Sequence, residues 1–107
     1  MDCIFCKIIN GEIPSAKVLE TDEVLAFDDI EPKAKVHVLI VPKKHIESVK
    51  HLEEIDKNLV SELVFTAQKI AKEKELEGYK LVFNVGREGG QIVDHLHLHL
   101  LSGDVQI

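Results

Sequence analysis

The segment His95-Leu96-His97-Leu98-His99-Leu100-Leu101 alternates histidine with leucine. Successive side chains of a β-strand point to opposite faces of the sheet, so this segment, as a strand, places three histidines on one face and the leucines on the other. The leucines can enter a core, and the three imidazoles then stand in a row on a rigid element. Imidazole exchanges protons near neutral pH, acts as a nucleophile and binds metals. The segment therefore predicts a strand that carries a chemical site.

A glycine-rich loop, Gly86 to Gly90, precedes this segment and allows a close approach of the backbone to a bound group. Two simpler interpretations fit the same residues. The histidines can form the polar face of a surface strand, or all three can bind one metal ion together with a water. Three histidines in register favour a chemical role. No carboxylate-rich surroundings of a metal are obvious, because Asp94 would point to the opposite face of a regular strand.

The composition indicates one globular domain, residues 1–107, with 45% apolar and 30% charged residues. A net charge of −6 argues against general nucleic-acid binding, which depends on lysine and arginine contacts to phosphate. The longest apolar run, around residues 36–41, is far shorter than the ~20 residues that span a bilayer. The N-terminus lacks the pattern of a secretory signal, so we expect a cytoplasmic protein without a membrane partner.

Hydrophobic patterns predict an α+β fold in which strands surround one helix. Residues 17–21 and 24–27 predict a β-hairpin, and the apolar run 36–41 predicts a third strand. Residues 55–77 predict a long helix, because apolar residues recur there at three- and four-residue steps, and Gly78 is expected to end it. Residues 79–85 and 95–101 predict the fourth and fifth strands of an antiparallel sheet.

The only two cysteines form the motif Cys3-x-x-Cys6. In a reducing compartment a disulfide between them is disfavoured. The motif therefore indicates metal ligation, redox chemistry or two spare thiols.

The histidine segment matches the signature His-φ-His-φ-His-φ-φ, where φ is apolar, so the sequence resembles the histidine-triad family. The resemblance covers nearly the whole chain and includes Ile4-Phe5-Cys6-Lys7-Ile8-Ile9, Ile13-Pro14, Leu25-Ala26-Phe27, Asp29-Ile30, His37-Val-Leu-Ile-Val-Pro-Lys-Lys-His45, Asn84 and Gly89-Gly90-Gln91. It is similar to the Hint branch, the small nucleoside phosphoramidases. It implies a five-stranded antiparallel sheet with one long helix and a short N-terminal helix, and a homodimer that pairs through the long helix and the fourth strand into a continuous sheet.

The resemblance implies hydrolysis of nucleoside 5′-phosphoramidates, such as conjugates of AMP or GMP, through a nucleotidyl-histidine on His97. A carbonyl of the glycine loop, matched by Gly90, would hold the other ring nitrogen of His97. His99 would act with it, and His37 would support the triad by hydrogen bonding. Hydrolysis of dinucleoside polyphosphates, or a nucleotide-binding scaffold with incidental turnover, are alternative functions. Many relatives carry Ser or Thr where this chain has Ile92, so a hydroxyl donor is absent.

The implied nucleotide site combines apolar groups around the base, a carboxylate at the ribose and donors to the phosphate. By matched position these residues are Phe5, Ile8, Phe27, Asp29, Ile30, Asn84, Gly90, Gln91, Val93, His97 and His99. Taken singly, the apolar ones are equally compatible with core packing. The zinc-binding members of the family further imply a structural Zn²⁺ held by Cys3, Cys6, His45 and His95, whereas His51 is expected at the surface.

Overall fold

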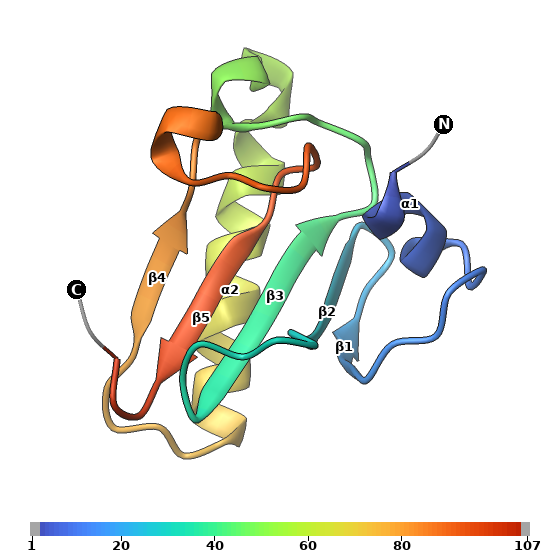
Figure 1. Cartoon of the computed structure of the whole chain (residues 1–107). Coiled ribbons are helices and arrows are strands. Elements are labelled where there is room, and N and C mark those ends of the chain that lie inside the picture. Colours follow the sequence, from blue (N-terminus) through green and yellow to red (C-terminus); the bar gives the residue numbers. More distant parts are fainter. Residues whose placement is uncertain (1–2, 106–107) are drawn as a thin grey trace.

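A computed structural model describes residues 3–105, so the outermost parts of the predicted domain, residues 1–2 and 106–107, lie outside the described residues. It confirms the five-stranded antiparallel sheet, in the order β1-β2-β3-β5-β4. The strands are β1 (Lys17–Glu20), β2 (Val24–Asp28), β3 (Val36–Pro42), β4 (Lys80–Phe83) and β5 (Leu98–Ser102). The helices are α1 (Ile4–Ile9) and α2 (Lys57–Glu73), and the 3-10 turns are η1 (Val49–His51), η2 (Glu54–Asp56) and η3 (Arg87–Gly89). Figure 1 shows α2 running along one side of the sheet and α1 near β1 and β2.

The central strands β2 and β3 are buried on both faces of the sheet because they carry apolar residues at consecutive positions. In β2, Val24 and Ala26 pack in the cluster that includes α2, whereas Leu25 and Phe27 pack in the cluster that includes α1. The same alternation continues in β3. The predicted entry of the alternating leucines into the core is confirmed, since the α2 cluster includes Leu96, Leu98 and Leu100.

The long helix is confirmed by its buried stripe, which follows helical spacing and consists of Leu63, Thr66, Ala67, Ile70 and Ala71. The helix is shorter than predicted at both ends. At its C-terminus Glu75 adopts a left-handed φ of 56°, and the N–H of Leu76 donates to the carbonyl of Ala71 at 2.9 Å. This Schellman geometry ends the helix before Gly78, so the prediction that Gly78 is the left-handed terminator is wrong.

The fifth strand begins at Leu98, so the prediction that it begins at His95 is also wrong. The ladder between β3 and β5 ends at the pair Ile40 and Leu98. Beyond this pair Pro42 has no N–H to donate, and its carbonyl lies 2.8 Å from Nε2 of His95. A side-chain hydrogen bond therefore takes the place of the next backbone pair, and the chain bends at His95.

The register of the strands places His37 and His99 on the face of the sheet that packs against α1. His99 lies opposite Leu39, which packs in the cluster of α1, and His37 lies two residues before Leu39 on the same strand. The site thus forms on the face away from α2. Within residues 3–105, no helix is both long and apolar enough to cross a membrane.

Candidate active site

The bend before β5 divides the three histidines between two clusters. The rings of His97 and His99 are neighbours, with centroids 4.9 Å apart. The ring of His95 turns instead to His45, with centroids also 4.9 Å apart. The three imidazoles therefore do not form a single row, and one metal held by all three does not fit this arrangement.

His97 is buried, and a hydrogen bond to the backbone fixes its protonation pattern. Its Nδ1 lies 2.7 Å from the carbonyl oxygen of His95, which can only accept, so Nδ1 carries the proton. The acceptor is thus the carbonyl of His95 and not that of Gly90, as the resemblance implied. Burial lowers the pKa of His97, although the bond to His95 opposes this shift. The neutral ring then has a free electron pair on Nε2.

His37 and His99 form a second chain of hydrogen bonds. The backbone N–H of Lys33 donates to Nδ1 of His37 at 3.0 Å, so the neutral His37 ring carries its proton on Nε2. That N–H donates to Nδ1 of His99 at 2.9 Å and leaves the proton of His99 on its Nε2. Asp29 lies on the same chain, with Oδ2 3.5 Å from Nε2 of His37. His99 consequently presents an N–H where His97 presents an electron pair.

Burial keeps this pair of rings neutral. It lowers the pKa of His99 to about 4, and the neighbouring His97 and His37 add to that shift. It also lowers the pKa of His37, against an opposing effect of the Asp29 carboxylate. Both rings therefore keep the proton positions just described at neutral pH.

The glycine loop is held by amide side chains. Asn84 donates from Nδ2 to the carbonyl of Gly89 at 2.8 Å, next to Gly90, whose φ of +86° favours glycine. Gln91 is only 3% exposed, and its Oε1 accepts from the N–H of Gly86 at 2.9 Å.

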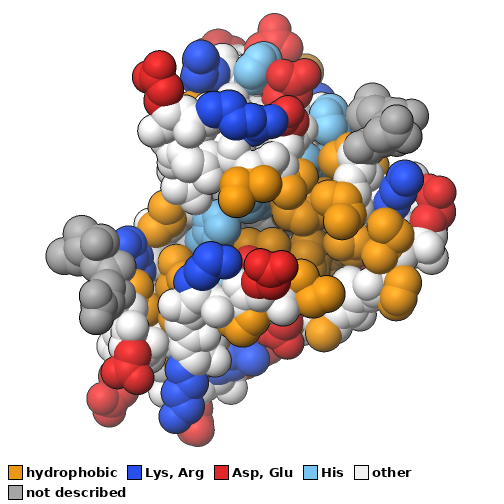
Figure 2. All heavy atoms as spheres, viewed as in Figure 1, with side chains coloured by type: hydrophobic (Ala, Val, Ile, Leu, Met, Phe, Trp, Pro, Cys, Tyr) orange, Lys and Arg blue, Asp and Glu red, His pale blue; other side chains and the backbone are white. Residues whose placement is uncertain are grey.

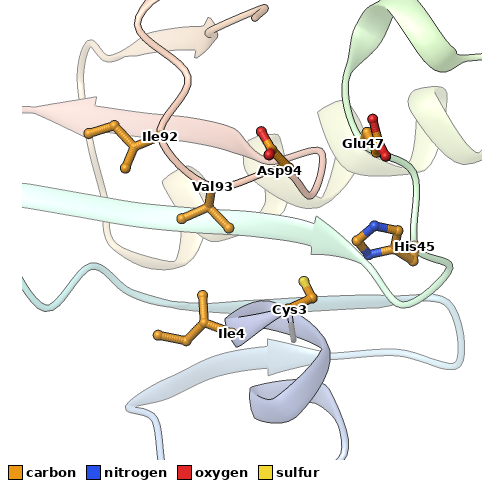
Figure 3. A pocket seen from close by; sticks show the side chains of 7 residues that line it. All are labelled: Cys3, Ile4, His45, Glu47, Ile92, Val93 and Asp94. Carbon is orange, nitrogen blue, oxygen red and sulfur yellow. The ribbon is translucent and has the colours of Figure 1, made fainter. Parts of the chain in front are cut away.

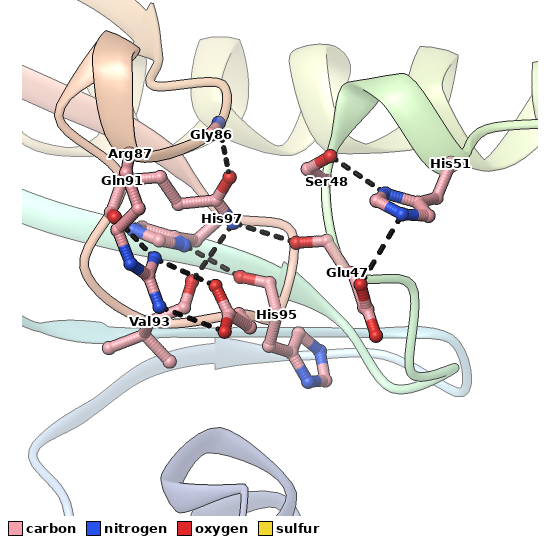
Figure 4. A network of polar contacts seen from close by, with 10 residues as sticks. Glu47, Ser48, His51, Gly86, Arg87, Gln91, Val93, His95 and His97 are labelled. Atoms are coloured by element: carbon pink, nitrogen blue, oxygen red, sulfur yellow. Dashed lines mark hydrogen bonds and ion pairs between the residues drawn. The ribbon is translucent and has the colours of Figure 1, made fainter.

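The amide nitrogen of Gln91 is fully used by the protein (Figure 4). Nε2 donates to the carbonyls of Glu47 at 2.7 Å and Val93 at 2.9 Å. Both amide hydrogens thus have partners, and the expected donation to phosphate has no free N–H in this arrangement. Gln91 instead ties the glycine loop to the segments on either side of it.

An ion pair that the sequence reasoning missed also secures this loop. Arg87 binds Asp94 through two hydrogen bonds of 2.8 and 2.9 Å, and Nη1 of Arg87 also donates to the carbonyl of Gln91 at 2.6 Å. The available sequence signal is a positive charge within the glycine loop and a negative charge shortly after it. The prediction of a regular strand from His95 hid this signal, because it pointed Asp94 to the face opposite the histidines. His51, as expected, is at the surface, where its ring contacts Ser48 and Glu47.

The predicted base-binding residues lie in different environments. Phe5, Ile8 and Phe27 are buried together. The ring of Phe5 also packs edge-on against that of His97, with ring centroids 5.1 Å apart. Val93 packs against this group, whereas Ile30 is 94% exposed and belongs to neither core cluster. The apolar floor beside the histidines is therefore in place, and Ile30 is free to contact a ligand.

A shallow cavity of about 410 Å³ borders the site on the side of α1 (Figure 3). It is lined by Cys3, Ile4, His45, Glu47, Ile92, Val93 and Asp94. Ile92 lies on its rim and is 85% exposed. Figure 2 shows histidine atoms in a depression of this face, next to an apolar surface.

The predicted metal ligands come together in one cluster. Nδ1 of His95 lies 3.1 Å from Nδ1 of His45 and 3.3 Å from Sγ of Cys3, and Sγ of Cys6 lies 3.3 Å from Nδ1 of His45. Donor atoms around a tetrahedral Zn²⁺ lie about 3.3–3.8 Å apart, given Zn–N and Zn–S bonds of about 2.0 and 2.3 Å. The donor types suit such an ion, and the separations of 3.1 and 3.3 Å are at or slightly below these values.

The proton positions agree with this fit. Nε2 of His95 donates to the carbonyl of Pro42, so Nδ1 turns a free electron pair toward the cysteines. Burial, with a contribution from Cys3, raises the pKa of the Cys6 thiol to about 11. A coordinated cation would offset this effect, because thiols lose their proton when they bind a metal.

Known proteins resemble this chain in sequence and fold over nearly its whole length. A family model described as "Scavenger mRNA decapping enzyme C-term binding" matches residues 2–107. An uncharacterized HIT-like protein of Helicobacter pylori is 48% identical over 103 residues, which cover 94% of this chain and 96% of that protein. A histidine triad protein from Clostridium difficile has a TM-score of 0.95 at 50% identity, covering 100% of this chain and 95% of the other. A HIT family hydrolase from Legionella pneumophila has a TM-score of 0.95 at 46% identity, covering 99% and 96%. The chain belongs to the histidine-triad (HIT) family.

Proposed function

We propose that this protein is a nucleotide hydrolase that cleaves nucleoside 5′-phosphoramidates and releases a nucleoside monophosphate. The observation that carries the proposal is the hydrogen bond from Nδ1 of His97 to the carbonyl of His95, which leaves an electron pair on Nε2. A histidine held in this way is an activated nucleophile. The likeness to a HIT family hydrolase supports the same reaction class.

The first step forms a bond between Nε2 of His97 and the α-phosphorus and breaks the bond from phosphorus to the leaving nitrogen. The departing amine must gain a proton. A neutral His99 ring has a single N–H proton and would become an anion if it lost it, so the amine takes its proton from water. Nε2–H of His99, whose ring centroid is 4.9 Å from that of His97, can instead donate a hydrogen bond to a phosphoryl oxygen. His37 supports this role, because it fixes the proton of His99 on Nε2.

The second step returns His97 to its starting state. Water attacks the phosphorus, the bond between phosphorus and Nε2 breaks, and the nucleoside monophosphate leaves. The proton of the attacking water passes to the solvent and balances the proton that the amine took up in the first step. Splitting the displacement in two lowers each barrier and explains the need for a buried, neutral pair of imidazoles.

A purine nucleoside monophosphate conjugate is the proposed substrate class. Phe5, Ile8 and Phe27 are buried beside the histidines, at 4–8% exposure, and would form the apolar floor under a flat base, whereas the exposed Ile30 can contact it from outside. Asp29, whose Oδ2 lies 3.5 Å from Nε2 of His37, supplies a carboxylate beside the histidines, where ribose hydroxyls can donate to it.

Replacement of the nucleophile tests the reaction. His97→Ala should abolish AMP release from adenosine phosphoramidate and from a diadenosine polyphosphate, and His97→Gly should regain part of it with free imidazole. His51→Ala, at the surface, serves as the matched histidine control. Near-normal turnover by His97→Ala would exclude the covalent mechanism and favour a metal-activated water.

We also propose that Cys3, Cys6, His45 and His95 hold a structural Zn²⁺, which would link the N-terminus to the end of β3 and the start of the triad. Its binding free energy would add to folding stability. Protein purified without chelator should contain about one zinc per chain, as a closed four-ligand site requires. Chelation should lower the melting temperature, and Cys3→Ser/Cys6→Ser should lose the metal. Retention of zinc by that variant would contradict the assignment.

We further propose a homodimer that pairs through α2 and β4. β4 is an edge strand of the sheet, and large apolar side chains on α2, on β4 and just before β4 are exposed, namely Val64, Phe65, Leu81 and Tyr79. An edge strand beside an apolar surface favours pairing with a second copy.

The two free cysteines support a reducing compartment, which we take to be the cytoplasm.

A further inference from the structure

His95 takes part in the metal cluster and in the catalytic site through different atoms. Its side chain is fully buried, at 0% exposure. Ring atom Nδ1 lies in the cluster, 3.1 Å from Nδ1 of His45. Its backbone carbonyl, in contrast, accepts the N–H of the His97 ring at 2.7 Å. A displacement of this one residue therefore changes the hydrogen bond that sets the protonation pattern of the nucleophile.

The sheet does little to hold His95 in place. It precedes β5, whose first residue paired with β3 is Leu98. Two hydrogen bonds compensate within the described part of the chain. Nε2 of His95 donates to the carbonyl of Pro42 at 2.8 Å, and the N–H of Leu96 donates to the carbonyl of Ile46 at 2.6 Å. Both bonds join the chain at His95 to the end of β3 and the segment after it, and the ring of His95 also packs edge-on against that of Phe5, with centroids 5.9 Å apart, whereas its Nδ1 faces the cluster.

On the cluster side, four atoms that can bind a metal lie close together. The bond to Pro42 leaves Nδ1 of His95 unprotonated, and Nδ1 of His45 and the sulfurs of Cys3 and Cys6 lie 3.1 to 3.6 Å from it. Such atoms repel one another unless a cation or a shared proton lies between them. A cation bound by the four residues would remove this repulsion, and its one bond to Nδ1 would hold the ring of His95 from the cluster side.

We propose that His95 is a positioning residue through which the metal cluster keeps His97 in its reactive protonation pattern. This inference rests on the proposed covalent hydrolysis and on a metal in the cluster. When the cluster holds a cation, the ring of His95 is fixed at both nitrogens and its carbonyl stays aimed at Nδ1 of His97. When the cation is lost, the carbonyl moves, and the proton of His97 can shift to Nε2, the atom that must attack.

NMR of protein labelled with ¹⁵N-histidine tests the link directly, in zinc-loaded and chelator-treated samples. The zinc-loaded protein should show His97 with its proton on Nδ1, exchanging slowly with water. After zinc removal we expect both protonation patterns of His97 and exchange at least about tenfold faster. His99 is the internal control, since His37 and not the cluster fixes its proton. Its signals should stay unchanged, and a second zinc addition should restore those of His97.

Kinetics provide the second measurement. Zinc removal should lower kcat about tenfold or more and change KM by less than about twofold, because the wrong protonation pattern impairs the chemical step and not binding. Cys3→Ser/Cys6→Ser should behave like the chelated protein if it folds, and chelation of the wild-type chain covers the case in which it does not.

Three results would overturn the inference. The first is a metal-free protein in which His97 keeps its slowly exchanging Nδ1 proton. The second is an equal change in the NMR signals and proton exchange rates of His97 and His99, which would indicate that zinc removal loosens the whole site. The third is failure of the cluster to bind zinc at all. A protein that hydrolyses no nucleotide but shows the expected NMR changes would refute the proposed function and leave the link between cluster and His97 intact.

Discussion

Replacement of Gln91 by alanine separates a structural role of this amide from direct phosphate binding. The side chain makes three hydrogen bonds, to the N–H of Gly86 and to the carbonyls of Glu47 and Val93, at 2.7 to 2.9 Å (Figure 4). A typical intramolecular hydrogen bond contributes about 1 kcal/mol, and a buried group without a partner costs more. Gln91→Ala should therefore lower the free energy of unfolding by about 3 kcal/mol. In a domain of this size, that corresponds to a melting temperature lower by roughly 10–20 °C.

Denaturant unfolding and nucleotide release should be measured on the same samples. Gln91→Glu keeps the size and the acceptor for Gly86 but turns a carboxylate toward two carbonyls, so it should be at least as destabilising as alanine. Asn58→Ala removes an exposed amide and should change the free energy of unfolding by less than about 0.5 kcal/mol. A Gln91→Ala protein as stable as wild type, with only weaker nucleotide binding, would refute this reasoning and restore the direct phosphate contact.

Three further predictions concern pH, leaving-group chemistry and assembly. The pKa of His99 is near 6.5 when unfolded and about 4 when folded, so the unfolded chain binds more protons between these values. Stability should be complete above about pH 6.5 and fall toward pH 4, and His99→Gln should reduce the slope of urea midpoint against pH; a midpoint independent of pH would contradict the burial argument. Ile92→Ser should leave the melting temperature unchanged and raise kcat/KM for a phosphoramidate roughly 2–13-fold, the worth of one hydrogen bond. Unchanged kinetics would place Ile92 away from the reacting phosphorus. Light scattering at micromolar concentration should give twice the 12.0 kDa chain mass, and Phe65→Asp should give the monomer; a wild-type monomer would exclude the dimer.

The sequence predicted the regular elements well where local patterns decide them. The apolar run of β3 and the helical spacing of α2 depend on side chains that each element presents to a core, so their periodicity identifies them. The ends were less predictable. Glu75 terminates α2 in a conformation that glycine usually takes, and nothing in the local sequence marks it for that role.

The candidate site shows the same division between local and long-range effects. His97 and His99 could be paired from their spacing, because both lie on one face of the chain near β5. The direction of His95 could not, since it depends on the carbonyl of Pro42, fifty-three positions earlier in the chain. Likewise, the amide of Gln91 matches a phosphate donor by motif, but its partners in the fold use both of its hydrogens.

The sequence by itself determined the α+β sheet, the histidine-triad family and the residue types that carry the chemistry, because periodicity and motif spacing are properties of short segments. Only the tertiary structure decided which ring nitrogen of each histidine carries the proton and which histidine faces the cysteines. The reason is that hydrogen-bond partners are contributed by distant strands and loops. The carbonyl of Pro42 and the N–H of Lys33 set the protonation of His95 and His37, and a backbone group leaves no signature in the sequence.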